Sequence, residues 1–379
     1  MPPVPPTVSE PCCDGPYRPR SLLLQWHVTE RCNLRCAHCY QEQYAGEELP
    51  LAALRGILDQ FTELLASWQG GPRGRRVPGQ VTVTGGEPFL RSDCFDLLEL
   101  LAARRRQLQF AVLTNGSLLD DAVARRLRRL RPAFVQVSVE GTRQTHDGIR
   151  GPGNFDRTVA AIRRLVGHRI ATLISFSAHR GNYREFAAVA DLGRELGVTR
   201  VWADRVIPFG SGAAMKDHVL TPDQTRELFQ IMHDARSAAR RRWFRRTQIA
   251  MHRALQFLVG GGTPYRCTAG DSLITIGVQG DLYPCRRMPI RVGNVLETPL
   301  VELYQQTELF RRLRDRRRTS AGCEGCSYAR LCGGGLRCLA YAITGDPLTG
   351  DPLTGDPLAA DPGCWHATGV VFPHIREQG

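Results

Sequence analysis

The sequence predicts an α/β protein, a partial (β/α)6 TIM-like barrel followed by a C-terminal cysteine-rich domain. Between residues 21 and 210, six short apolar runs alternate with segments whose apolar residues recur at helical intervals. Polar motifs directly follow several of the apolar runs. Seven of the thirteen cysteines then lie between Cys267 and Cys364. These three observations indicate parallel strands joined by helices, with a second cysteine-bearing unit behind them.

The expected strands and helices alternate along the first half of the chain. The strands are 22–28, 81–84, 109–114, 134–139, 170–176 and 199–206, and the helices are 50–68, 92–106, 119–130, 154–166 and 183–196. The polar motifs that follow strands are 31–40, Gly85-Gly86-Glu87-Pro88, Asn115-Gly116 and Glu140-Gly141. In a barrel such strand ends converge on one face, whereas an open sheet spreads them along an edge. We therefore expect a barrel with its active site at these ends.

Four segments follow from this pattern. Residues 1–20 are expected to be disordered, 21–210 to form the barrel, 211–265 to be a helical connector and 266–379 to form the cysteine-rich domain. Thr221-Pro222-Asp223 is typical of a helix start, with Thr at the cap and Pro at the first position. In the last segment we expect a β-hairpin around 274–283 and a helix near 299–315. The repeated Thr-Gly-Asp-Pro-Leu units from residue 344 predict a surface loop.

Net charge and hydropathy argue against a nucleic-acid-binding protein, a membrane protein and a secreted protein. The net charge is +13, but Lys216 is the only lysine, and the arginine runs fall at the ends of helical patterns, where cations are favoured. We therefore expect no nucleic acid partner. Neither an apolar run of about 18 residues nor a secretory signal is present, so we expect a cytoplasmic protein that does not enter a membrane. Cysteines in that compartment stay reduced, which favours metal binding over disulfides.

The first cysteine motif is Cys32-x3-Cys36-x2-Cys39, directly after the first expected strand. Three thiolates at this spacing can surround one soft metal centre, and zinc, copper(I) and iron–sulfur clusters all accept such ligands. Three protein ligands on a cubane cluster would leave one of its four irons open for a small molecule.

This spacing resembles the signature of the radical S-adenosylmethionine (SAM) enzymes. The resemblance implies that Cys32, Cys36 and Cys39 hold a [4Fe-4S] cluster whose open iron binds the amino and carboxylate groups of SAM. Reduction by a donor such as flavodoxin or ferredoxin would cleave SAM to a 5′-deoxyadenosyl radical. The further SAM contacts implied by the resemblance are His38, Gly85, Gly86, Glu87, Ser138, Arg150 and Arg205. Glu87 is expected at the SAM amino group, and Ser138 and Arg150 at its carboxylate.

The second set of cysteines resembles the SPASM extension of radical SAM enzymes. A zinc ribbon needs only four cysteines, whereas seven suit two clusters. The resemblance implies two auxiliary [4Fe-4S] clusters, the nearer on Cys267, Cys285 and Cys338 and the outer on Cys323, Cys326, Cys332 and Cys364. Where that family has a cysteine, this chain has Leu336, so we expect Cys338 to replace it.

Enzymes with this layout mostly modify ribosomally made peptides or protein side chains, so a peptide maturase is the first expectation. The alternative is side-chain modification of a tetrapyrrole, because 333–347 and Asp361-Pro362-Gly363-Cys364 also resemble haem-synthesis members. A non-enzymatic iron–sulfur electron-transfer protein would explain the cysteines. It would not explain Gly85-Gly86-Glu87 or the spacing of Ser138 and Arg150. The sequence identifies no catalytic side chain.

Overall fold

The protein is described here by a computed structural model that covers residues 16–69, 76–240, 247–344 and 359–366. Most of the segment expected to be disordered and nearly all of the repeated pentapeptides lie outside the described residues. No helix in the described ranges is both long enough and apolar enough to cross a membrane.

One ten-stranded sheet forms the centre of the described chain, in the order β10-β9-β8-β1-β2-β3-β4-β5-β6-β7. The strands are β1 Leu22–His27, β2 Gly79–Thr84, β3 Leu108–Thr114, β4 Val135–Ser138, β5 Thr172–Ala178, β6 Arg200–Arg205, β7 Gln248–Ala250, β8 Leu273–Ile276, β9 Asp281–Tyr283 and β10 Gly293–Asn294. All pairings from β8 through β1 to β7 are parallel. The pairs β8–β9 and β9–β10 are antiparallel. Because β10 and β7 are the two ends of this order, the barrel is partial.

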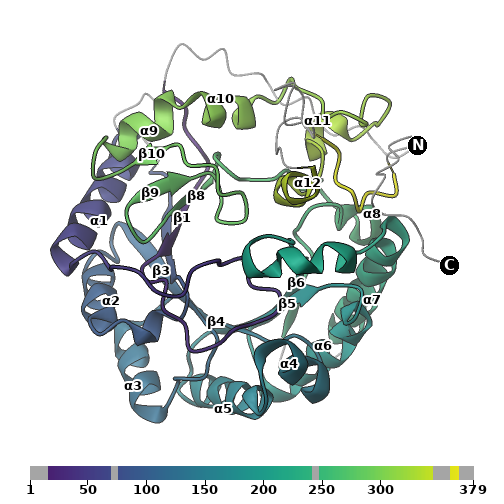
Figure 1. Cartoon of the computed structure of the whole chain (residues 1–379), viewed down its shortest axis with the longest axis horizontal. Coiled ribbons are helices and arrows are strands. Elements are labelled where there is room, and N and C mark those ends of the chain that lie inside the picture. The colour runs from purple at the N-terminus through teal and green to yellow at the C-terminus, as the bar shows by residue number, and fades with distance from the viewer. Residues whose placement is uncertain (1–15, 70–75, 241–246, 345–358, 367–379) are drawn as a thin grey trace.

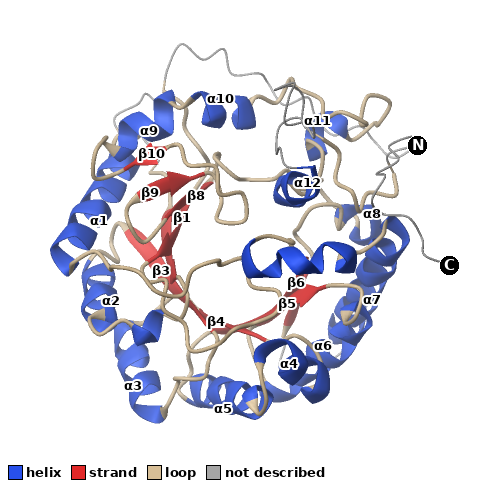
Figure 2. Cartoon of the chain, in the orientation of Figure 1, coloured by secondary structure: helices blue, strands red, loops and turns tan. Residues whose placement is uncertain are grey.

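Helices surround the arc of strands (Figures 1 and 2). The longer helices that cover the barrel are α1 Leu51–Ala66, α2 Cys94–Ala103, α3 Asp121–Leu130, α5 Asn154–Gly167, α6 Phe186–Leu196 and α7 Pro222–Arg240. The other helices are α4 Arg143–Arg150, α8 Phe257–Gly260, α9 Leu300–Gln306, α10 Glu308–Arg314, α11 Ala329–Cys332, α12 Arg337–Thr344 and the 3-10 helices η1 Pro88–Leu90, η2 Tyr183–Glu185 and η3 Gly210–His218.

The two faces of β1 illustrate how the core is divided. Leu22, Leu24 and Trp26 are buried in the main hydrophobic cluster. Leu23 and Gln25, which alternate with them, line a cavity inside the arc instead. Successive strand residues point to opposite faces, so one face packs against the helices while the other borders the cavity.

The six expected barrel strands and the five helices between them are confirmed, with end shifts of a few residues. The hairpin is also confirmed, as β8 paired with β9. Thr221 caps α7 as expected, since its hydroxyl accepts a hydrogen bond from the Gln224 amide (3.2 Å).

Three features differ from the sequence-based expectation. The region expected as a helical connector also contains β7, whose three residues are too few to give a strand pattern. β8 pairs in parallel with β1, so the sheet continues past residue 266 into the cysteine-rich segment. The helix expected near 299–315 is two helices, because Thr307 has an extended backbone (φ −59°, ψ 124°).

Candidate functional site

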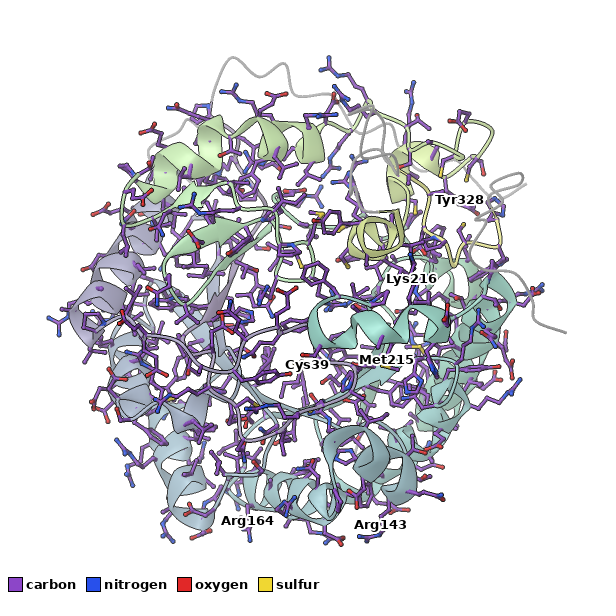
Figure 3. The ribbon with its side chains drawn as sticks, in the orientation of Figure 1. Cys39, Arg143, Arg164, Met215, Lys216 and Tyr328 are labelled. Carbon is purple, nitrogen blue, oxygen red and sulfur yellow. The ribbon has the colours of Figure 1, made fainter. Side chains whose placement is uncertain are left out.

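The loop after β1 carries Cys32, Cys36 and Cys39 to the middle of the molecule, where Cys39 is labelled in Figure 3. Gly85 and Gly86, directly after β2, fix the start of this loop. The Gly86 amide donates to the Thr29 carbonyl (2.9 Å), and the Glu87 amide donates to the Arg31 carbonyl (2.8 Å). A Cβ on Gly85 would lie 2.3 Å from the Thr29 oxygen, and one on Gly86 would lie 2.2 Å from the Arg31 oxygen. Both positions therefore require glycine for a close approach of two backbones.

The other end of the loop is held by η3, which carries the Met215 and Lys216 labelled in Figure 3. The Gly212 amide donates to the Cys39 carbonyl (2.7 Å). A Cβ on Gly210 would lie 2.2 Å from the Tyr40 oxygen. The segment after β6 thus packs directly on the cysteine loop.

The three thiols of the loop share one electrostatic environment. Burial raises the pKa of Cys32 and of Cys36, and the charges of neighbouring thiolates in the same loop raise both further. Donors face two of the sulfurs, since Asn115 Nδ2 lies 3.9 Å from Cys32 Sγ and Arg150 Nη1 lies 3.7 Å from Cys36 Sγ. Such donors and a bound cationic centre both favour the thiolate that a cluster needs.

Within the described ranges, no three His, Cys, Asp or Glu side chains converge tightly enough for a single metal ion. In a cubane cluster each cysteine binds a different iron, so its sulfurs stand farther apart than the ligands of one ion. Three thiolates are a donor set that suits such a cluster.

Glu140 organises the side chains beside the cysteine loop. It is fully buried, and its Oε1 accepts from Arg150 Nη2 (2.6 Å) and lies 3.3 Å from His38 Nε2. Its Oε2 accepts from the Ser177 amide (2.9 Å). Burial alone would raise the pKa of the Glu140 carboxyl, but Arg150 and His38 lower it well below its usual range. A permanent carboxylate thus orients Arg150 toward the loop.

A cavity of about 370 Å³ begins at the cysteine loop and extends into the interior of the barrel. The residues predicted for the SAM site that line it are Cys32, Cys36, Cys39, His38, Gly85, Gly86, Ser138, Arg150 and Arg205. On its inner wall the Ser138 and Ser175 hydroxyls lie 3.2 Å apart. The structure therefore brings together all the predicted SAM-site residues except Glu87.

Glu87 is the one predicted SAM-site residue that does not line the cavity. Its carboxylate is fully buried and accepts from the Thr114 hydroxyl (2.8 Å) and the Asn115 amide (2.8 Å). Burial raises the pKa of Glu87 to about 7, despite these hydrogen bonds. The side chain joins the end of β2 to the end of β3, so it supports the cavity wall from behind.

Arg205 also borders the cavity, and its guanidinium is paired with Asp361, through Nη1 to Oδ1 (2.6 Å) and Nη2 to Oδ2 (2.5 Å). Both side chains are buried. Arg205 therefore joins the barrel to the C-terminal segment.

The cysteines of the C-terminal segment lie in two parts of the structure. Burial raises the pKa of Cys285 and of Cys338, and the Cys267 thiolate raises both further. Burial likewise raises the pKa of Cys323 to about 12, followed by the charges of Cys364, Cys326 and Cys332. These last four cysteines line one small hollow. It lies near the edge of the molecule, where Tyr328 is labelled in Figure 3.

A glycine turn separates the two groups. Gly333, Gly334 and Gly335 have φ values of 65°, 86° and 82°, which disfavour other residues. The turn lets α11 end at Cys332 in the outer group while α12 begins beside Cys338 in the nearer group. Because α12 begins directly before Cys338, this cysteine lies at the start of the helix, although Leu336 occupies the position where the family has a cysteine.

The cavity reaches the nearer group, because Cys285 and Arg287 also line it. Sequence reasoning missed four further lining residues there, which are Trp202, Asp204, Arg253 and Arg287. The alternation of Trp202 and Asp204 along β6 was a usable signal, since both face inward. Arg253 and Arg287 follow strands of only three residues, which carry no comparable pattern.

Two family models match the chain. The radical SAM superfamily model matches residues 26–193, and SPASM, an iron–sulfur cluster-binding domain, matches residues 267–327. Together these matches cover more than half of the chain.

Relatives with different named activities have similar identities to this chain. The AdoMet-dependent heme synthase of Methanosarcina barkeri is 27% identical, over 86% of this chain and 94% of that protein. The pre-heme d1 synthase of Dinoroseobacter shibae is 26% identical over 87% of this chain and 84% of that protein. The mycofactocin maturase MftC of Mycolicibacterium smegmatis is 28% identical over 86% of this chain and 80% of that protein.

Solved structures share the fold. SuiB of Streptococcus suis bound to S-adenosylmethionine superimposes with a TM-score of 0.70 at 15% identity, covering 91% of this chain and 77% of that one. Native anSMEcpe with bound AdoMet superimposes with a TM-score of 0.69 at 18% identity, and the match covers 93% of this chain and 96% of that one. The chain therefore belongs to the radical SAM superfamily, as an enzyme that uses a [4Fe-4S] cluster and SAM and carries auxiliary iron–sulfur clusters in a SPASM domain.

Proposed function

We propose that this enzyme oxidises a side chain of a tetrapyrrole. The observation that carries the proposal is the position of the cavity between two groups of cysteines. Cys32, Cys36 and Cys39 border one part of it, and Cys285 of the nearer auxiliary group borders another. A substrate side chain in this cavity would have a hydrogen acceptor on one side and an electron acceptor on the other. That arrangement suits a net oxidation.

The cluster on the cysteine loop, when bound and reduced by a donor such as flavodoxin or ferredoxin, supplies the electron that cleaves SAM to methionine and a hydrogen-abstracting 5′-deoxyadenosyl radical. In the proposal, Arg150 binds the SAM carboxylate, and Glu140 keeps that arginine oriented through their 2.6 Å contact. His38 and Ser138, on the same wall, add polar contacts. The enclosing strands exclude water, which protects a reactive intermediate.

The chemistry balances for a propionate side chain. Loss of one hydrogen atom and one electron from a propionate leaves a vinyl group and releases CO₂, so no separate proton acceptor is needed. The hydrogen would end on 5′-deoxyadenosine, and Cys285 would help to hold an auxiliary cluster that could take the electron. The cavity of about 370 Å³ lies within the ~300–1,000 Å³ range of small-molecule sites.

The comparisons support a tetrapyrrole over a peptide. The first five relatives are named for the synthesis of heme, pre-heme d1 or Fe-coproporphyrin III. The first of them matches across 94% of its own length. A tetrapyrrole is therefore the first candidate substrate and a peptide the second, whereas the sequence motifs alone favoured the peptide.

A peptide or protein substrate is the second candidate. It is favoured by the mycofactocin maturases, which are 28–29% identical over 86% of this chain. SuiB was also solved bound to its precursor peptide SuiA, and it superimposes with a TM-score of 0.65 at 16% identity.

The test is an anaerobic assay of the reconstituted enzyme with SAM, a reductant and iron-coproporphyrin III. We expect 5′-deoxyadenosine together with a porphyrin that has lost CO₂ and two hydrogens per converted side chain. The Cys32→Ala/Cys36→Ala/Cys39→Ala variant serves as the control and should form neither. An unchanged porphyrin, with 5′-deoxyadenosine formation that the porphyrin does not stimulate, would exclude this substrate class.

A further inference from the structure

We propose that Arg253 binds a carboxylate of the substrate inside the cavity, an inference that rests on the proposed tetrapyrrole function. Arg253 lies just after β7 and lines the cavity together with Trp202 of β6. Neither residue belongs to the cysteine motifs or to the predicted SAM contacts. The site would select substrates with a side chain that ends in a carboxylate.

The guanidinium of Arg253 is pre-positioned by an aromatic face. Its Cζ lies 4.6 Å from the centroid of the Trp202 ring. The indole is itself fixed, because Trp202 Nε1 donates to Gln136 Oε1 (3.0 Å). The turn that carries Arg253 is fixed as well, since its amide donates to Gln256 Oε1 (3.0 Å). Stacking on an aromatic ring leaves the edge of a guanidinium free to donate hydrogen bonds.

Arg253 differs from the other arginines that line the cavity, because no described carboxylate forms an ion pair with it. Four arginines line the cavity, and three have acidic partners within 3 Å. These are Arg150 with Glu140 (2.6 Å), Arg205 with Asp361 (2.5 Å) and Arg287 with Asp204 (2.8 Å). Among the residues that the structure describes, no carboxylate forms an ion pair with Arg253. A cation without a partner in a recessed cavity is a site for an anion.

Asp204 also lines the cavity, but its carboxylate is already paired. Burial alone would raise the pKa of the Asp204 carboxyl, but Arg287 and then Arg253 lower it. Its oxygen is hydrogen-bonded to Arg287 Nη1. The Asp204 carboxylate therefore faces two guanidinium groups, and its ion pair is with Arg287.

The position of Arg253 would orient this side chain of the substrate. Arg253 lines the cavity together with Cys285 and Arg287, so it lies on the side of the nearer auxiliary group. A carboxylate held there would keep the attached carbons between that group and the cysteine loop. Arginine suits this role because its planar fork binds both oxygens of a carboxylate.

The test measures binding of iron-coproporphyrin III and of its tetramethyl ester to the reconstituted enzyme, by titration of the porphyrin absorption band. Arg253→Met and Arg253→Gln remove the charge, Arg253→Lys retains it, and Arg128→Met is the control on an exposed part of α3. We expect both neutral variants to bind the tetra-acid about 10- to 100-fold more weakly, as loss of a charge-assisted hydrogen bond implies. Arg253→Lys should retain part of the affinity. Affinity for the ester, SAM affinity and iron content should not change.

Three outcomes would overturn the inference, and they are distinguishable. Equal tetra-acid binding by the wild type and both neutral variants would remove Arg253 from the site while leaving the proposed function intact. Weakened SAM binding, with porphyrin binding unchanged, would assign Arg253 to the cofactor. Absence of porphyrin binding by the wild type, with SAM cleavage intact, would refute the proposed function and the inference together.

Discussion

Arg205 and Asp361 form a buried, doubly hydrogen-bonded ion pair that joins the end of β6 to the segment before Cys364. The same carboxylate accepts hydrogen bonds from the amides of Leu336 (2.8 Å) and Gly363 (2.9 Å). These amides lie next to the glycine turn and to Cys364. One ion pair therefore connects the barrel with the segments that carry both auxiliary groups of cysteines.

Asp361→Asn should destabilise the protein and reduce its iron content. The substitution leaves the Arg205 guanidinium buried without a counter-charge, which in other proteins costs about 3–5 kcal/mol. The midpoint of urea unfolding and the iron content after reconstitution measure both effects. Asp156→Asn is the matched control, because Asp156 pairs with Arg143 at the surface. If both variants unfold at the wild-type midpoint, the ion pair has no structural role.

Glu140→Asp should weaken SAM binding by roughly 10-fold, because the shorter side chain cannot reach both Arg150 and the Ser177 amide. Glu140→Gln should have at least as large an effect, since it removes the charge that orients Arg150. Equilibrium binding of SAM to the reconstituted variants gives the comparison. Wild-type affinity in both would show that Arg150 needs no carboxylate to bind SAM.

Gly86→Ala should impair cluster retention, because its Cβ would lie 2.2 Å from the Arg31 carbonyl oxygen and would displace the cysteine loop. Gly56→Ala is the control, as Gly56 lies in α1 with nothing within 4 Å of an added Cβ. That change should be neutral or stabilising by up to about 1 kcal/mol. Iron content and 5′-deoxyadenosine formation are the measurements. Full iron content and activity in Gly86→Ala would contradict the close packing of the two backbones.

Glu87 should make stability depend on pH just below neutrality. Its pKa is raised to about 7 in the folded protein, from 4.5 when unfolded, so the folded state binds the extra proton between these values. The stabilisation of the folded state is therefore lost as pH rises from about 4.5 to about 7, at up to about 1.4 kcal/mol per unit. Relative to Glu87→Gln, the wild type should lose stability between about pH 5 and 7. Parallel unfolding curves for the two proteins across that range would contradict the raised pKa.

The sequence predicted the barrel strands and the residue types at the site, but not the partners of every side chain. Strands such as β1 and β2 were visible because alternation and apolar runs are local properties. Glu87 and Arg205 were expected at SAM, yet their partners Thr114 and Asp361 are supplied by tertiary structure. No local pattern connects Arg205 with a residue 156 positions away.

The anaerobic iron and sulfide content, measured with 5′-deoxyadenosine formation, tests the account most directly. Wild-type protein should hold about twelve irons, and the Cys32→Ala/Cys36→Ala/Cys39→Ala variant about eight without any 5′-deoxyadenosine, as four irons per cluster require. Unchanged iron and continued 5′-deoxyadenosine formation in that variant would contradict the assignment of the central cysteine loop.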